Sequence, residues 1–170
     1  QTYYVSVIAE NNAGLLSAAS VSDGQTLDTS TPVQENWVPA TGSVLTSDST
    51  SLTFDTGEIA TCSWSLYDEA YAQMENSCSG AGSASHTCSV NALSQGDEYI
   101  YTGCIDSAGN ENTAVDNYQL YYFVDSISPV QSAWTPATGT AMATTSVSIS
   151  LTTDENATCR WSLSDQDYNS

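Results

Sequence analysis

The chain has almost no positive charge. Among its 170 residues there is no lysine, one arginine (Arg160) and one histidine (His86), against 20 acidic residues, so the formal net charge is -19 at pH 7. A surface this negative repels phosphate backbones and anionic lipid headgroups, which argues against nucleic-acid binding. The lack of lysine also excludes lysine-to-asparagine isopeptide cross-links within these residues. Two interpretations of the acidic surplus stay open: a solvated surface, or a salt-rich or calcium-rich setting that screens or binds the carboxylates.

Long apolar runs and catalytic motifs are absent as well. No run of about twenty apolar residues is present, so the sequence predicts no membrane insertion in this segment. His86, the only histidine, lies in Ser85-His86-Thr87 without a nucleophile elbow or an orienting motif, and the cysteines lack the spacing of zinc ligands. We therefore predict that these residues do not form an enzyme.

The strongest positive pattern is an internal repeat. The heptapeptide ATCSWSL at 60–66 returns as ATCRWSL at 157–163, an offset of 97 residues. Without a gap, about 20 of the 43 residues that start at Thr31 are identical at this offset. Trp64 therefore corresponds to Trp161, and the chain contains two copies of one module.

The offset divides the chain into three parts. We predict the last strands of one module at residues 1–29, a complete module at 30–126, and the first strands of a repeat of that module at 127–170. Both flanking parts lack strands that a complete module has. We expect those strands either from the same polypeptide, continuing past these residues, or from a neighbouring subunit by strand donation.

Alternation of apolar and polar residues predicts an all-β fold. Leu52 and Phe54 alternate with polar residues in 50–55, and Trp64 lies in a second alternating segment, 60–67. About seven short strands, with turn signals roughly every ten residues, predict an antiparallel β-sandwich for the complete module. The residues expected in the cores are Leu52, Phe54, Trp64 and its repeat counterpart Trp161.

Five cysteines in a Ser/Thr-rich chain without lysine predict an oxidising compartment. The positions of the cysteines in the chain favour two disulfides, Cys62 with Cys104 and Cys78 with Cys88. Their chain-entropy contributions to folding stability are about 4 and about 3 kcal/mol. Cys159 is then unpaired within the chain. As the counterpart of Cys62 it is expected to bond a residue about 42 positions further on. An intermolecular bond or a reactive thiol is the alternative.

Several of these segments resemble known extracellular modules. The pattern Tyr-x-Val-x-Val-x-Ala at 3–9, followed by an Asn/Ala/Gly turn, resembles the end of fibronectin type III and related bacterial immunoglobulin-like modules. The CxW motif at 62–64, YxxxGC at 99–104 and the DSAGN turn at 106–110 resemble the cysteine-bearing Ig-like repeats of large bacterial or archaeal surface proteins. The resemblance implies tandem Ig-like and fibronectin III-like sandwiches in an extracellular or cell-surface protein. Unlike in antibody domains, the cysteine and the tryptophan share one strand, so the bridge is expected to link neighbouring strands.

Candidate calcium ligands lie at the predicted module ends. Asp28 and Asp125 open the two Asp-x-x-x-Pro boundaries, and Asp106 and Asn110 lie in the DSAGN turn. One interpretation is a calcium ion that stiffens the joint, because hard cations take several oxygen ligands. The other is that these side chains cap their own turns, and no other cofactor is expected. Asn156, in Asn-Ala-Thr, is an N-glycosylation sequon that stays open between a chance match and a modified turn.

Tyrosines gather on adjacent predicted strands. Facing inward they would pack as cross-strand pairs, and facing outward they would offer a flat amphipathic surface to sugar rings or to a neighbouring subunit. The residues concerned are Tyr99, Tyr101, Tyr118, Tyr121 and Tyr122.

The function predicted from the sequence is structural or adhesive. The chain is expected to be a segment of a large secreted or cell-surface repeat protein, acting as a stalk, an adhesin or an extracellular filament. Its expected partners are neighbouring modules, neighbouring subunits in a filament and, in the adhesive case, glycans. The alternative is a set of glycan-binding or spacer modules in a secreted polysaccharide-degrading enzyme.

Overall fold

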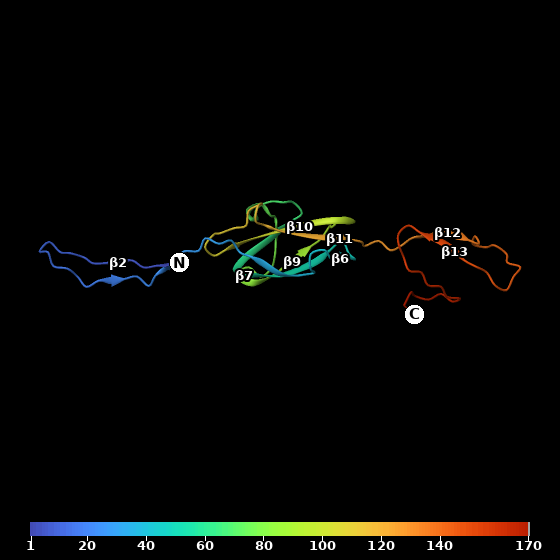
Figure 1. The fold of residues 1–170 in the computed structure, drawn as a ribbon, viewed down its shortest axis with the longest axis horizontal. Coiled ribbons are helices and arrows are strands. Elements are labelled where there is room, and N and C mark those ends of the chain that lie inside the picture. The colour runs from blue at the N-terminus through green and yellow to red at the C-terminus, as the bar shows by residue number, and fades with distance from the viewer. Residues whose placement is uncertain (170) are drawn as a thin grey trace. The chain divides into compact units, whose positions relative to one another are not determined.

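The computed structural model describes residues 1–169, and among these residues it contains β-strands and one 3-10 turn but no α-helix (Figure 1). The all-β prediction is confirmed. The chain divides into two compact units, the first covering Gln1–Ser126 and the second beginning at Ile127. Ser170, the last residue of the predicted third part, lies outside the described residues.

The first 27 residues form an antiparallel hairpin. Strand β1 (Thr2–Tyr3) pairs with β4 (Gln25–Thr26), and β2 (Ser6–Val7) pairs with β3 (Ser20–Val21). At the tip, the Oδ1 atom of Asn11 accepts hydrogen bonds from the backbone N–H groups of Ala13, at 2.9 Å, and Leu15, at 3.0 Å. The apolar side chains of the hairpin are exposed, for example Val5 at 62% and Leu16 at 67%. The hairpin therefore has no covered apolar face of its own.

The complete module is built around one long strand, β7 (Thr50–Ser65). The first part of β7 pairs with β5 (Gln34–Val38) and β9 (Ser83–Val90), and its second part pairs with β8 (Asn76–Ser77) and β10 (Gly96–Asp106). Strand β10 continues the sheet to β11 (Tyr118–Val124), and β11 pairs in parallel with β6 (Val44–Leu45). A 3-10 turn, η1 (Tyr71–Gln73), precedes β8.

Both parts of β7 contribute to one hydrophobic core. The pairing register between β7 and β9 shifts between Asp55 and Ala60, and on the other side of β7 the neighbour changes from β5 to β10 over the same residues. Leu52 and Phe54 enter the core from the first part and Trp64 from the second, with 0%, 2% and 5% of their surfaces exposed. These are the core positions that the alternation predicts. The remaining members of the cluster are Leu45, Ala60, Cys62, Cys78, Cys88, Val90, Leu93, Ile100, Cys104, Leu120, Tyr122 and Val124.

The second unit repeats the opening strands of the complete module in backbone as well as in sequence. Strand β12 (Gln131–Thr135) pairs with β13 (Ser150–Thr153), and the pair Gln131 with Thr153 lies at the same offset of 97 residues from the pair Gln34 with Thr56. Both copies carry a register shift within this pairing. Both also place one non-glycine residue at positive φ, Asn36 at 59° and Ala133 at 51°.

The prediction that Trp161 lies in a core is wrong for the described chain. Trp161 is 83% exposed, whereas its counterpart Trp64 is 5% exposed. In the complete module the strand of Trp64 is paired with β10 on one side and β8 on the other, and β11 continues the sheet. Among the described residues the second unit has no counterparts of these strands, so its apolar face stays in contact with solvent.

Candidate functional site

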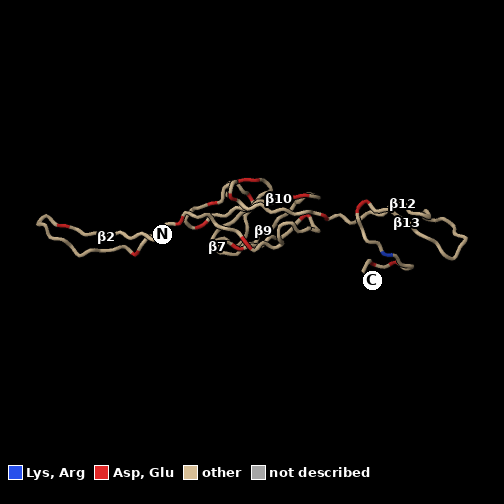
Figure 2. Tube along the Cα trace, in the orientation of Figure 1, with Lys and Arg blue, Asp and Glu red and all other residues tan. Residues whose placement is uncertain are grey.

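Acidic side chains occur in every part of the chain (Figure 2). The single arginine, Arg160, belongs to the second unit. Its guanidinium donates a hydrogen bond to the carbonyl oxygen of Tyr168 at 2.9 Å and lies 4.5 Å from the centre of the Tyr168 ring. Residues 1–126 therefore contain no lysine or arginine at all. A search of the described residues for helices that are long and apolar enough to cross a membrane finds none.

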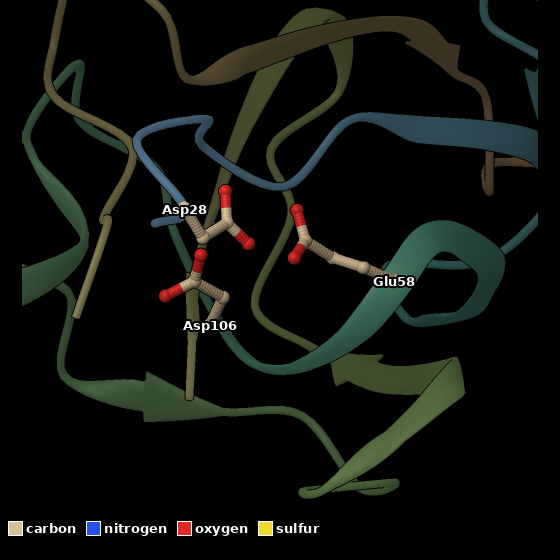
Figure 3. A group of neighbouring side chains, drawn as sticks. All are labelled: Asp28, Glu58 and Asp106. Atoms are coloured by element: carbon tan, nitrogen blue, oxygen red, sulfur yellow. The ribbon is translucent and has the colours of Figure 1, made fainter. Parts of the chain in front are cut away.

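Three carboxylates converge at one end of the complete module (Figure 3). Asp28 belongs to the segment that follows the N-terminal hairpin, Glu58 lies in β7 at the register shift, and Asp106 ends β10. One carboxylate oxygen from each of the three residues lies within 4.8 Å of the others. Within residues 1–169 this is the only group of three or more such side chains with the spacing of metal ligands.

The carboxylates of this cluster differ in their surroundings. Asp106 accepts hydrogen bonds from the backbone N–H groups of Ala108 and Asn110 and from the side-chain amide of Asn110, each at 2.8 Å. The side-chain bond from Asn110 is the main cause that lowers the pKa of Asp106. Partial burial, followed by the negative charges of Asp28 and Asp106, raises the pKa of Glu58. The cluster therefore holds one fixed carboxylate and one that is destabilised in its charged form.

The structure brings together some of the calcium ligands that the sequence proposed and separates others. Asp28 and Asp106 lie in the cluster, and the side-chain amide of Asn110 donates a hydrogen bond to Asp106. Asp125 is not a member; it follows β11, and its backbone N–H bonds the carbonyl oxygen of Leu45 at 2.8 Å. Three carboxylates can offer oxygen ligands to a hard cation, so calcium binding stays a prediction.

Glu58 was missed by the sequence analysis. A signal for it existed, because Glu58 returns as Glu155 at the same offset of 97 residues that relates Asp28 to Asp125. Its place next to Asp106 depends on the register shift in β7, which no local sequence pattern announces.

His86 is packed inside the module. It is 2% exposed, its Nε2 atom lies 3.0 Å from Thr56 Oγ1, and its ring centre lies 5.2 Å from that of Phe54. The neighbouring Ser85 faces the other way along β9 and donates to Asp55 Oδ1 at 2.7 Å. Serine and histidine therefore point to opposite sides of the strand, so Ser85 and His86 do not form a nucleophile–base pair.

The cysteines form two disulfides, the same pairs that the sequence predicts. Cys62 is bonded to Cys104 and Cys78 to Cys88. Cys62 and Cys104 are directly opposite each other on the paired strands β7 and β10, so this bridge links neighbouring strands. Cys159 is an exposed free thiol in the described chain.

Asn156 lies on an exposed segment just after β13. This position is accessible, as a glycosylation site must be, and glycosylation of Asn156 stays a prediction.

The tyrosines of the complete module divide between its interior and its surface. Tyr122 is fully buried and donates a hydrogen bond to the carbonyl oxygen of Pro39 at 2.8 Å, and burial raises its pKa to about 12. Tyr118 is 38% exposed and stacks on Trp37, with ring centres 5.3 Å apart. Tyr99 is 46% exposed, and Tyr101 and Tyr121 are partly exposed on the same face of the sheet.

Comparison with known proteins adds no relative to this picture. No protein-family model matches the chain, and no curated protein matches it.

Proposed function

We propose that the chain is a segment of a tandem array of Ig-like and fibronectin III-like β-sandwiches in a secreted or cell-surface protein. In that setting it serves as a stalk, an adhesin or an extracellular filament. The observation that carries this proposal is the second unit, which repeats the backbone and register of β5 and β7 while it exposes the residues that the complete module buries.

The repeat supports an array because each module type needs all of its strands to cover its core. Leu52 is fully buried in the complete module, whereas its counterpart Ile149 is 60% exposed in the second unit. Strands equivalent to β9, β10 and β11 would cover Ile149 and Trp161 in the same way. Repeat proteins bury their apolar faces by adding such units along one polypeptide.

The boundary segments support a role as a mechanically connected series. The segment that opens the complete module is bound to the rest of it, since the carbonyl oxygen of Pro32 accepts a hydrogen bond from the Asn112 side chain at 3.4 Å. The Oδ1 atom of Asn112 also accepts from the backbone N–H of Cys104 at 2.9 Å. The same Asp-x-x-x-Pro sequence leads into the second unit at 125–129. Tension on the chain would thus pass from the boundary into a core that a disulfide closes.

The disulfide state of Cys159 in the natural polypeptide tests this proposal. Peptide mapping without reduction is expected to find Cys159 bonded to a cysteine of the same polypeptide, about 42 residues further on, as Cys62 is bonded to Cys104. A free Cys159 thiol, or a Cys159 bond between two copies of the polypeptide, would contradict completion of the module within one chain.

A further inference from the structure

The two strands β10 and β11 present an aromatic outer face where a two-layer fold ordinarily presents a polar one. Ile100 and Leu120 point inward and are fully buried, so the alternate residues point outward. On that side Tyr99 lies opposite Tyr121 in the antiparallel register. We name this surface the tyrosine face; its residues are Tyr99, Tyr101, Gln119, Tyr121 and Phe123.

The rings of the tyrosine face are held in place before any ligand arrives. The centres of the Tyr99 and Tyr121 rings lie 5.5 Å apart. The Tyr121 hydroxyl donates to Asp97 Oδ1 at 2.8 Å, and the amide of Gln119 donates to the Tyr101 hydroxyl at 2.8 Å. Side chains fixed in this way lose little conformational entropy when a partner binds, so the surface is preorganised.

Apolar rings and free polar atoms alternate across this surface. Phe123 is 44% exposed, and Val44, paired with it on β6, is 62% exposed. The Tyr101 hydroxyl accepts the Gln119 bond and keeps its own proton for donation. The second carboxylate oxygen of Asp97 and the Oε1 atom of Gln119 accept no hydrogen bond from any described residue.

The charge of the module selects the kind of partner. Residues 1–126 contain no lysine or arginine, and Asp97 lies at the edge of the tyrosine face, so an anionic ligand is repelled. Because small-molecule sites are concave, an open sheet surface favours an extended ligand over a small molecule. A chain of uncharged sugar rings fits both conditions, because each ring has an apolar C–H side for an aromatic ring and hydroxyls at its edge.

We propose that the tyrosine face binds a neutral polysaccharide, with Tyr99, Tyr121 and Phe123 stacking on sugar rings and with Tyr101, Gln119 and Asp97 bonding sugar hydroxyls. This inference rests on the proposed function only in so far as it requires an exported chain, and it assigns the adhesive role to one surface of the complete module.

Native affinity electrophoresis of the 170-residue protein tests this inference. The gels contain hydroxyethylcellulose, galactomannan or arabinoxylan as neutral polysaccharides, and alginate as an anionic one. The protein is expected to be retarded by at least one neutral polysaccharide and not by alginate. Tyr99→Ala is expected to weaken that binding about tenfold, as loss of an aromatic anchor does at other interfaces.

Two further variants keep the test decisive. Tyr67→Ala is the matched control, because Tyr67 is 76% exposed, follows the end of β7 and lies outside the tyrosine face; it is expected to bind like the unmodified protein. Gln119→Ala changes an exposed polar side chain, so it tests the surface even if Tyr99→Ala fails to fold, and it is expected to weaken binding.

Three results would overturn the inference. One is the absence of retardation by every neutral polysaccharide, and another is equal weakening by Tyr67→Ala and Tyr99→Ala. The third is a concentration-dependent dimer in size-exclusion chromatography that Tyr99→Ala abolishes, since that would assign the surface to contacts between copies of the protein. None of these results changes the expected bond of Cys159, so failure of this inference and failure of the proposed array remain distinguishable.

Discussion

The repeated tryptophan provides a matched pair of substitutions with opposite expected effects. Trp64 is 5% exposed and belongs to the core cluster, so Trp64→Ala removes a buried indole and leaves a cavity. Such a change costs about 3 to 5 kcal/mol of unfolding free energy. Trp161 is 83% exposed, and Trp161→Ala is expected to change the unfolding free energy by less than about 0.5 kcal/mol.

Urea unfolding of the 170-residue protein, followed by far-ultraviolet circular dichroism with the disulfides intact, measures both effects. At a slope of about 2 kcal/mol per molar urea, a loss of about 4 kcal/mol lowers the midpoint by about 2 M. Trp64→Ala is expected to show this shift, and Trp161→Ala is expected to unfold at the midpoint of the unmodified protein. The two residues share the local sequence ATC-x-WSL, so any difference comes from the strands that pair with and cover the segment of Trp64 and not from the local sequence.

The reasoning fails if the two substitutions lower the midpoint equally. A loss of less than about 1 kcal/mol of unfolding free energy for Trp64→Ala would also contradict it, because removal of a buried indole leaves a cavity that costs more than this.

Three further predictions concern the disulfides, the buried histidine and the carboxylate cluster. Replacing Cys62 and Cys104 together with alanine is expected to cost at least about 4 kcal/mol in urea unfolding, and removing the shorter disulfide about 3 kcal/mol; the reverse order would contradict the loop-length argument. Burial lowers the pKa of His86 below the 6.5 of an unperturbed histidine. The unfolded chain therefore takes up a proton below about pH 6.5 while the native module stays neutral, so stability is complete above that pH and falls as the pH drops further. His86→Gln is expected to reduce the slope of unfolding free energy against pH between about 7 and about 5.5, and an unchanged slope would refute this assignment. In EDTA, Glu58→Gln is expected to raise the temperature of thermal unfolding, since burial and neighbouring carboxylates disfavour the charged form. If the cluster binds calcium, adding calcium is expected to make the unmodified protein unfold at a higher temperature than Glu58→Gln. The same order of unfolding temperatures with and without calcium would argue against calcium binding.

The features that the sequence predicts correctly depend on local alternation. Residues two apart on a strand share a face, so the alternation correctly groups Leu52 with Phe54 and Tyr99 with Tyr101; the structure then places the first pair in the core and the second on the outer face. The same alternation could not say which of the tyrosines face solvent, because that depends on which side of β10 and β11 is covered by the rest of the core. Of the five tyrosines on the predicted adjacent strands, the structure buries only Tyr122.

The features that the sequence does not predict depend on distant strands. Burial of a tryptophan requires covering strands, so Trp64 and Trp161 differ in exposure although they share the local sequence ATC-x-WSL. Glu58 joins Asp28 and Asp106 because β7 shifts its register against β9 between Asp55 and Ala60, and this shift is decided by pairing with β9 on one side of β7 and with β5 and β10 on the other. Long-range pairing of this sort leaves no trace in a short sequence window.

The intact mass of the natural polypeptide, denatured and reduced, tests most directly the claim that the chain belongs to a tandem array. The account predicts a mass many times the 18.0 kDa of these 170 residues, with the strands that cover Trp161 supplied by the same chain. A mass near 18.0 kDa would contradict it, because both partial modules would then have to be completed by other subunits.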